Sequence, residues 1–162
     1  MSAFTEVSDA AHTTAAQLLD RTNTRTLRLV LCDTAAVRRV RAVRVPTANV
    51  AQWCGKLSAE GIGLTTAIMA FPAQFDAPAP GAEAVGCSAV GEIRMVPDWS
   101  TLVALPWCPG PAFVHVWLRH RGGSPWALCP RAARQRALDA LADDDENSGG
   151  FSMRVGFESE FV

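Results

Sequence analysis

The sequence predicts an α+β roll, in which strands dominate the first part of the chain and one or two helices lie on them. Two kinds of segment lead to this fold class. Some alternate apolar and polar residues with the two-residue period of a strand, and others repeat apolar residues at helical spacing. The chain has 162 residues, 49% hydrophobic and 19% charged, which suits one globular domain or slightly more.

The first elements expected are a helix and a hairpin. Ser8 can cap a helix that runs to Arg21, because alanines and leucines recur there at helical spacing. A strand follows from Thr26 to Asp33, where three leucines alternate with other residues. Its partner is expected from Val37 to Val45, where valines mix with arginines. These arginines are expected on a solvated hairpin face, because no aromatic residue interleaves with them as in a phosphate-binding groove; they are Arg38, Arg39, Arg41 and Arg44.

The middle of the chain predicts a second helix, a long loop and three strands. Thr47 is placed to cap a helix through about Leu57, and Gly61 and Gly63 are expected to stop that helix. The stretch 71–86 contains three prolines and has no periodicity, so a mobile functional loop or flap is expected there. The strands follow at residues 92–96, 101–105 and 112–120.

The last elements expected are a helix and one further strand. Pro130 opens a helix to Leu141, because proline favours the first helical position. An acidic run at residues 143–146 is expected to be a solvated linker. Alternation from Phe151 to Val162 predicts the final strand.

Composition argues against several classes of protein. A formal net charge of −1 does not provide the broad positive field that non-specific nucleic-acid binding requires, so no nucleic-acid partner is expected. No apolar run reaches the ~20 residues of a membrane span, and the N-terminus does not look like a secretory signal. Five cysteines without a Cys-x-x-Cys pair indicate neither a disulfide framework nor a thiolate zinc site. The expected location is cytoplasmic.

The strongest chemical feature is the pair Glu158 and Glu160 in the final predicted strand. Residues two apart on a strand point to the same face, so the two carboxylates would lie side by side. Like charges held together are costly unless a cation neutralises them, and hard oxygen ligands suit Mg²⁺ or Mn²⁺. A solvent-facing strand with ordinary acidic residues is the alternative that the motif alone leaves open.

Four segments, in content and order, resemble the glutamine synthetase family: Gly91–Thr101 with its Pro-Asp-x-Ser-Thr, Leu105–Trp107, Pro125–Arg131 with its Pro-Arg, and Gly156–Phe161 with its Glu-x-Glu. The resemblance covers roughly residues 15–162. It implies an N-terminal extension at 1–24, a β-grasp domain at 25–128, and the beginning of the catalytic domain at 129–162. That last part would hold a linking helix and the first metal-binding strand.

The resemblance also implies an activity, an ATP-dependent ligase of glutamine biosynthesis and nitrogen metabolism that joins glutamate to ammonia or a larger amine. Glu158 and Glu160 would hold the Mg²⁺ or Mn²⁺ ions that bind the phosphates of ATP. Family members are oligomers in which the β-grasp domain completes a neighbouring active site. The resemblance therefore places Asp98 and Trp99 at a subunit interface, at the edge of that site, in a homo-oligomer.

The sequence departs from the family pattern in two places. Residues 63–70 lack the ammonium-binding aspartate of the family's Asp-Gly-Ser-Ser motif, which favours a larger amine such as a polyamine as substrate. The sequence ends at Val162, before the family's remaining ligands for metal, nucleotide and glutamate, so this polypeptide alone is expected to be inactive. A non-catalytic β-grasp module for binding or oligomerisation is the alternative from a different functional class.

Overall fold

The computed structural model describes residues 9–75, 77–143, 153–156 and 158. Within these residues there are six strands and three α-helices, joined in part by short 3₁₀ helices. In chain order the elements are α1 Asp9–Arg21, β1 Thr26–Cys32, β2 Arg38–Arg44, α2 Val50–Glu60, β3 Ile62–Thr65, η1 Thr66–Ala70, η2 Ala82–Val85, β4 Glu92–Pro97, η3 Trp99–Thr101, β5 Val103–Ala104, β6 Pro111–Arg119 and α3 Pro130–Asp143.

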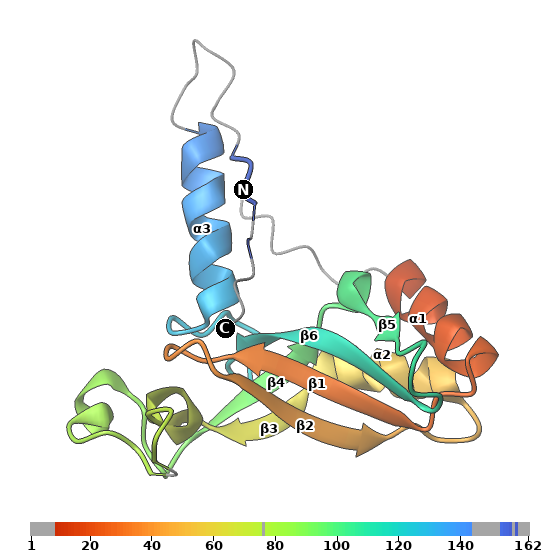
Figure 1. Cartoon of the computed structure of the whole chain (residues 1–162), viewed down its shortest axis with the longest axis horizontal. Coiled ribbons are helices and arrows are strands. Elements are labelled where there is room, and N and C mark those ends of the chain that lie inside the picture. Colours follow the sequence, from red (N-terminus) through yellow and green to blue (C-terminus); the bar gives the residue numbers. More distant parts are fainter. Residues whose placement is uncertain (1–8, 76, 144–152, 157, 159–162) are drawn as a thin grey trace.

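The strands form one curled, mixed sheet in the order β2-β1-β6-β4-β3, with β5 also paired to β6 (Figure 1). The central strands β1 and β6 are parallel, and Leu29 is in register with Val114. The other strand pairs are antiparallel. A parallel pair requires a long crossover connection, and here the chain between β1 and β6 provides it with β2, α2, β3, β4 and β5.

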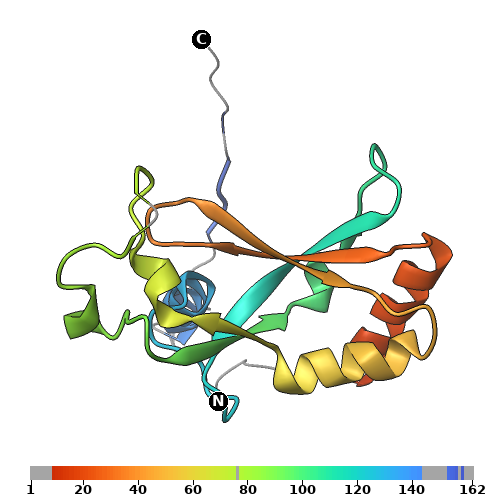
Figure 2. The same ribbon diagram turned by 90° about the horizontal axis from the view of Figure 1, so that it is seen from below.

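The hydrophobic core lies between the inner face of this sheet and the helices α1 and α2, which lie together on one side of it (Figure 2). On β6, buried residues alternate with half-buried ones from end to end, as a two-residue period requires. Leu27 and Leu29 of β1 are fully buried on the inner face. The α+β class predicted from the sequence is confirmed.

The arginines of β2 are only partly a solvated face. Arg38 and Arg44 are exposed on the outer side of the sheet, but Arg39 and Arg41 point to the other side because successive side chains alternate. Arg41 Nη1 donates to the Gly63 carbonyl at 2.7 Å, and Arg39 Nε donates to the buried Asp33 carboxylate at 2.5 Å. The Arg41 contact joins the edge strand β2 to β3, the last strand at the other end of the sheet order, and the Arg39 contact lies within the β1–β2 hairpin.

Four local predictions are wrong in detail. The helix α2 begins at Val50 after Asn49, whose left-handed φ of 56° sets the turn, and Thr47 does not cap it. Gly63 lies within a strand, β3, which pairing to β4 creates despite its weak sequence pattern. The stretch 71–86 contains the short helix η2, and the strand expected at 101–105 is reduced to β5 because η3 occupies its first residue.

The helix α3 stands away from the sheet and touches it mainly at its first turn (Figure 1). Beyond it, residues 153–156 and 158 are exposed and are not in a strand. The final strand predicted at 151–162 is therefore not confirmed at these positions, and its other residues lie outside the described ones. Since β-strands need hydrogen-bonded neighbours, alternation alone did not suffice to make one.

Candidate functional site

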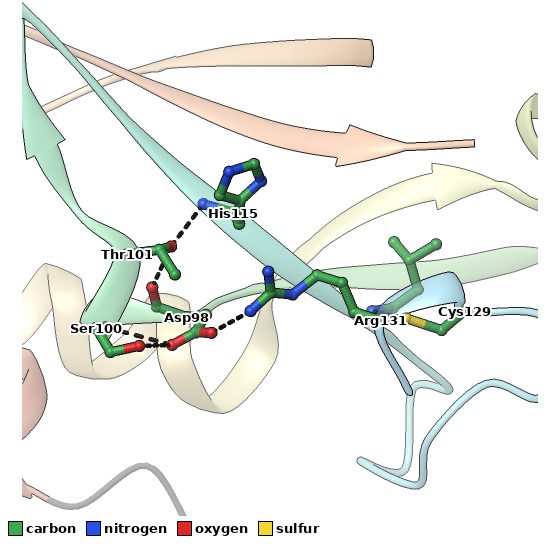
Figure 3. A network of polar contacts seen from close by, with 7 residues as sticks. Asp98, Ser100, Thr101, His115, Cys129 and Arg131 are labelled. Carbon is green, nitrogen blue, oxygen red and sulfur yellow. Dashed lines mark hydrogen bonds and ion pairs between the residues drawn. The ribbon is translucent and has the colours of Figure 1, made fainter. Parts of the chain in front are cut away.

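The junction between the sheet and α3 holds the main polar network of the described structure, centred on Asp98 (Figure 3). Asp98 follows β4 and caps η3, because its Oδ1 accepts hydrogen bonds from the Ser100 hydroxyl at 2.6 Å and the Ser100 amide at 3.3 Å. Its Oδ2 accepts from Arg131 Nη2 in the first turn of α3. The side chains are 17% and 26% exposed, so this ion pair is largely shielded from solvent.

The backbone of Asp98 is fixed as firmly as its side chain. Its amide donates to the His115 carbonyl of β6 at 2.8 Å. Its carbonyl accepts from the Thr101 hydroxyl at 2.8 Å, and the same Thr101 oxygen accepts from the His115 amide at 2.9 Å. These bonds continue the pairing of β4 with β6 beyond its last strand residue, so Asp98 is held in one place for Arg131 to reach.

Arg131 is held from two further directions. Its guanidinium carbon lies 4.6 Å from the centre of the Trp117 ring, a cation–π contact on the outer face of β6. The residues just before Arg131 are anchored to β6, because the Leu118 amide donates a hydrogen bond to Sγ of the buried Cys129 at 3.3 Å. The Cys129 thiol thus has a structural partner.

His115 is the titratable group of this junction whose protonation the structure perturbs. Burial lowers its pKa below the ordinary value, and the positive charges of Arg131 and Arg38 lower it further. The Asp98 carboxylate and a hydrogen bond to the Val30 backbone act in the opposite direction without reversing the shift. We therefore expect a neutral imidazole at pH 7.

Trp99 points away from Asp98, into the core. It is 7% exposed, and its indole Nε1 donates to the Ser58 hydroxyl of α2 at 2.7 Å. Ser58 in turn donates to the Cys54 carbonyl, which ties η3 to α2. The two residues expected together at a subunit interface thus have different surroundings within this chain, and their interface role stays a prediction.

The predicted metal pair lies at the end of the described chain. Glu158 is exposed, and Glu160 lies outside the described residues. Within the described ranges, no group of three His, Cys, Asp or Glu side chains comes together as a metal site. Glu158 and Glu160 as metal ligands therefore stay a prediction.

The chain is similar to known proteins, although no family model matches it. A gamma-glutamylanilide synthase of an Acinetobacter species is 32% identical over 72 residues, which are 44% of this chain and 13% of that protein. Type-1 glutamine synthetase 1 of Dictyostelium discoideum is 35% identical over 85 residues, 49% of this chain and 16% of that protein. The chain resembles the glutamine synthetase family.

Solved structures agree on the fold of this glutamine-synthetase-like chain. A GmaS complex with ADP matches with a TM-score of 0.56 and 22% identity over 81% of this chain and 26% of that one. A crystal structure described as a novel glutamine synthase homolog matches with a TM-score of 0.60 and 23% identity, over 75% and 27%. The chain thus spans a minor part of the length of each relative.

Among the described residues, no helix has the length and apolarity to cross a membrane.

The junction unites motifs that the glutamine-synthetase-like sequence showed only separately. Asp98 of the Pro-Asp-x-Ser-Thr stretch and Arg131 of the Pro-Arg pair meet as an ion pair, although 33 positions separate them. His115 and Trp117 belong to neither motif. No local pattern could have placed these two beside Arg131, because their proximity depends on where α3 begins relative to β6.

Proposed function

We propose that this chain is the β-grasp domain, linking helix and first catalytic segment of an ATP-dependent ligase that joins glutamate to an amine. The observation that carries the proposal is the Asp98–Arg131 pair, because it joins the two family motifs at the boundary where one domain would end and the next begin. Similarity to a gamma-glutamylanilide synthase and a glutamine synthetase supports the same reaction class. A cytosolic homo-oligomer is part of the proposal.

The sheet supports the β-grasp assignment at 25–128. A hairpin, β1 and β2, is followed by the helix α2, and β6 then returns to lie parallel to β1 at the centre of the sheet. The helix α2 packs on one face of the sheet. The extension at 1–24 contains α1, and the segment 129–162 contains α3 as the linking helix.

In this proposal Glu158 and Glu160 bind Mg²⁺ or Mn²⁺. Carboxylate oxygens are hard donors that suit these ions, and the exposed Glu158 leaves its oxygens accessible, so the donor chemistry fits. A bound divalent ion would neutralise charge on the phosphates of ATP. The contribution of this chain is two carboxylates, which is only part of a complete site.

Manganese binding tests the proposal directly. We expect Mn²⁺ to broaden the amide signals around Glu158 in heteronuclear NMR spectra, with weak affinity. The double variant Glu158→Gln with Glu160→Gln should abolish the effect. The matched control is Glu60→Gln with Glu83→Gln, which removes the same charge from exposed positions elsewhere. Equal loss in both double variants, or no broadening near Glu158, would overturn the metal assignment.

Turnover and amine choice need separate experiments. We expect no phosphate release from ATP by this polypeptide alone with glutamate and an amine, since two carboxylates do not form a complete site. ATP- and glutamate-dependent release would contradict this. The absence of the ammonium-binding aspartate from residues 63–70 favours a larger amine over ammonia.

A non-catalytic β-grasp module is the second candidate. The favouring observation is that the sheet, α1 and α2 enclose a hydrophobic core of their own. Such a module would bind a partner, or an intact relative, without metal. The manganese titration separates the two candidates, because the module should show no response that depends on Glu158.

A further inference from the structure

The outer face of the sheet, opposite α1 and α2, carries side chains that the proposed ligase function does not use. On β6 the residues Phe113, His115 and Trp117 are half-buried there, alternating with fully buried neighbours on the inner face. Val30 of β1 is in register with both Val40 of β2 and His115 of β6, so the three strands present one continuous surface. The first turn of α3 borders this surface where Arg131 lies over Trp117.

Two arginines and a histidine from three different elements lie on this surface. Arg38 is two positions before Val40 on the same face of β2, and Val40 is joined to His115 through Val30 of the strand between them. Arg131 lies over Trp117, which is two positions after His115 on the same face of β6. The positive charges of both arginines lower the pKa of the His115 ring. The carboxylate that also acts on this ring belongs to Asp98, and Arg131 and Ser100 already engage both of its oxygens. Arg38 is exposed and forms none of the ion pairs found among the described residues.

We propose that Arg38, His115 and Arg131 form a binding site for an oxyanion, the phosphate or carboxylate group of a ligand. Guanidinium groups offer forked donors that match both kinds of group. Arg131 is preorganised, because Asp98 and the Trp117 ring hold it in place before any ligand binds. The half-buried floor of the site reduces screening by water, which strengthens attraction to an anion.

Binding at this site is linked to a proton on His115. The charged groups that act on the imidazole are Arg38 of β2, Arg131 of α3 and Asp98 of the η3 turn, together with a hydrogen bond to the Val30 backbone of β1. The Phe113 ring lies 6.1 Å from it. Without a ligand, burial and the two arginines favour the neutral ring. A bound oxyanion offsets both positive charges and favours the imidazolium form. Affinity should therefore rise as the pH falls from 7 towards 6.

The test follows the ring protons of His115 by NMR against pH, with inorganic phosphate in one arm and acetate in the other, at constant ionic strength. We expect phosphate to raise the pKa of His115 by about half a unit or more, in a saturable way. An equal response to acetate would indicate a carboxylate ligand, and a response to phosphate alone a phosphorylated one. The exposed His120 gives an internal control, since its ring signals should not respond to the added anion in a saturable way.

A pair of charge variants makes the test specific. Arg38→Gln should raise the pKa of His115 without ligand and weaken phosphate binding about tenfold, the loss of one charge-assisted contact. Arg44→Gln removes the same charge from an exposed position of the same strand and should change neither quantity. The proposal is wrong if His115 shows no saturable response in either arm, or if both variants weaken binding equally. The metal test at Glu158 is independent of these results.

Discussion

Replacing Arg131 with methionine tests the physical account of the junction. The change leaves the Asp98 carboxylate, 17% exposed, bonded to Ser100 but without its cation. A hydrogen bond between charged groups contributes about 1.5–3 kcal/mol, and the contact with the Trp117 ring about 0.5–1 kcal/mol. Because both side chains keep some contact with water, the loss should not exceed the lower end of the range of about 3–5 kcal/mol for breaking a buried pair. We expect Arg131→Met to lower the free energy of unfolding by about 2–3 kcal/mol.

Urea unfolding followed by tryptophan fluorescence measures this loss. Arg134→Gln is the matched control, because Arg134 is exposed one turn further along α3, and its replacement should cost within about 0.5 kcal/mol. A double-mutant cycle with Asp98→Asn should give a coupling energy of about 1–2 kcal/mol. If Arg131→Met costs no more than Arg134→Gln, or the coupling is zero, the junction does not hold α3 to the sheet.

Three further predictions concern the core, a tight approach and pH. Leu29→Ala should cost about 2–5 kcal/mol in urea unfolding, because Leu29 is fully buried between β2 and β6. Gly61→Ala should cost more than about 1 kcal/mol, whereas Gly122→Ala should be nearly neutral. A Cβ added at Gly61, where φ is 60°, would lie 2.9 Å from the Met95 carbonyl oxygen. A Cβ added at Gly122 would meet no other described residue within 4 Å. Between pH 7 and 5, stability should fall less steeply in His115→Asn than in the original chain. The pKa of His115 is lower in the folded chain than in the unfolded chain, where it is about 6.5. As the pH falls below that value, the unfolded chain takes up the proton first, so the contribution of His115 to the free energy of unfolding is lost. Equal slopes would contradict this.

Local periodicity predicted the elements that depend on their own residues. The alternation of leucines in β1 and the proline at the start of α3 lie where the sequence placed them. The strand β3 was missed because four residues carry too little pattern, and pairing to β4 makes it a strand. The arginines of β2 were treated as one solvated group, although their side chains alternate between two faces with different surroundings.

For the candidate site too, the sequence singled out some residues, but only the fold shows which of them are in contact. Asp98 and the Pro-Arg pair stood out in the sequence because of their motifs. Their contact, the stacking of Arg131 on Trp117 and the charges around His115 arise only when β6 and α3 are brought together. Glu158 could be chosen as a ligand from its spacing to Glu160, but spacing acquires a geometric meaning only in a paired strand, and Glu158 is not in one.

The sequence by itself determined the class of fold, most of its helices and strands, and the likeness to glutamine synthetases, since these follow from periodicity and from short motifs read in order. Only the tertiary structure decided which charges neutralise each other, which arginine joins β2 to β3, and that Arg38 on the outer face forms none of the ion pairs of the described residues. The physical reason is that electrostatic and hydrogen-bond energies depend on distances between side chains remote in sequence. Those distances are set by the parallel pairing of β1 with β6 and by the docking of α3.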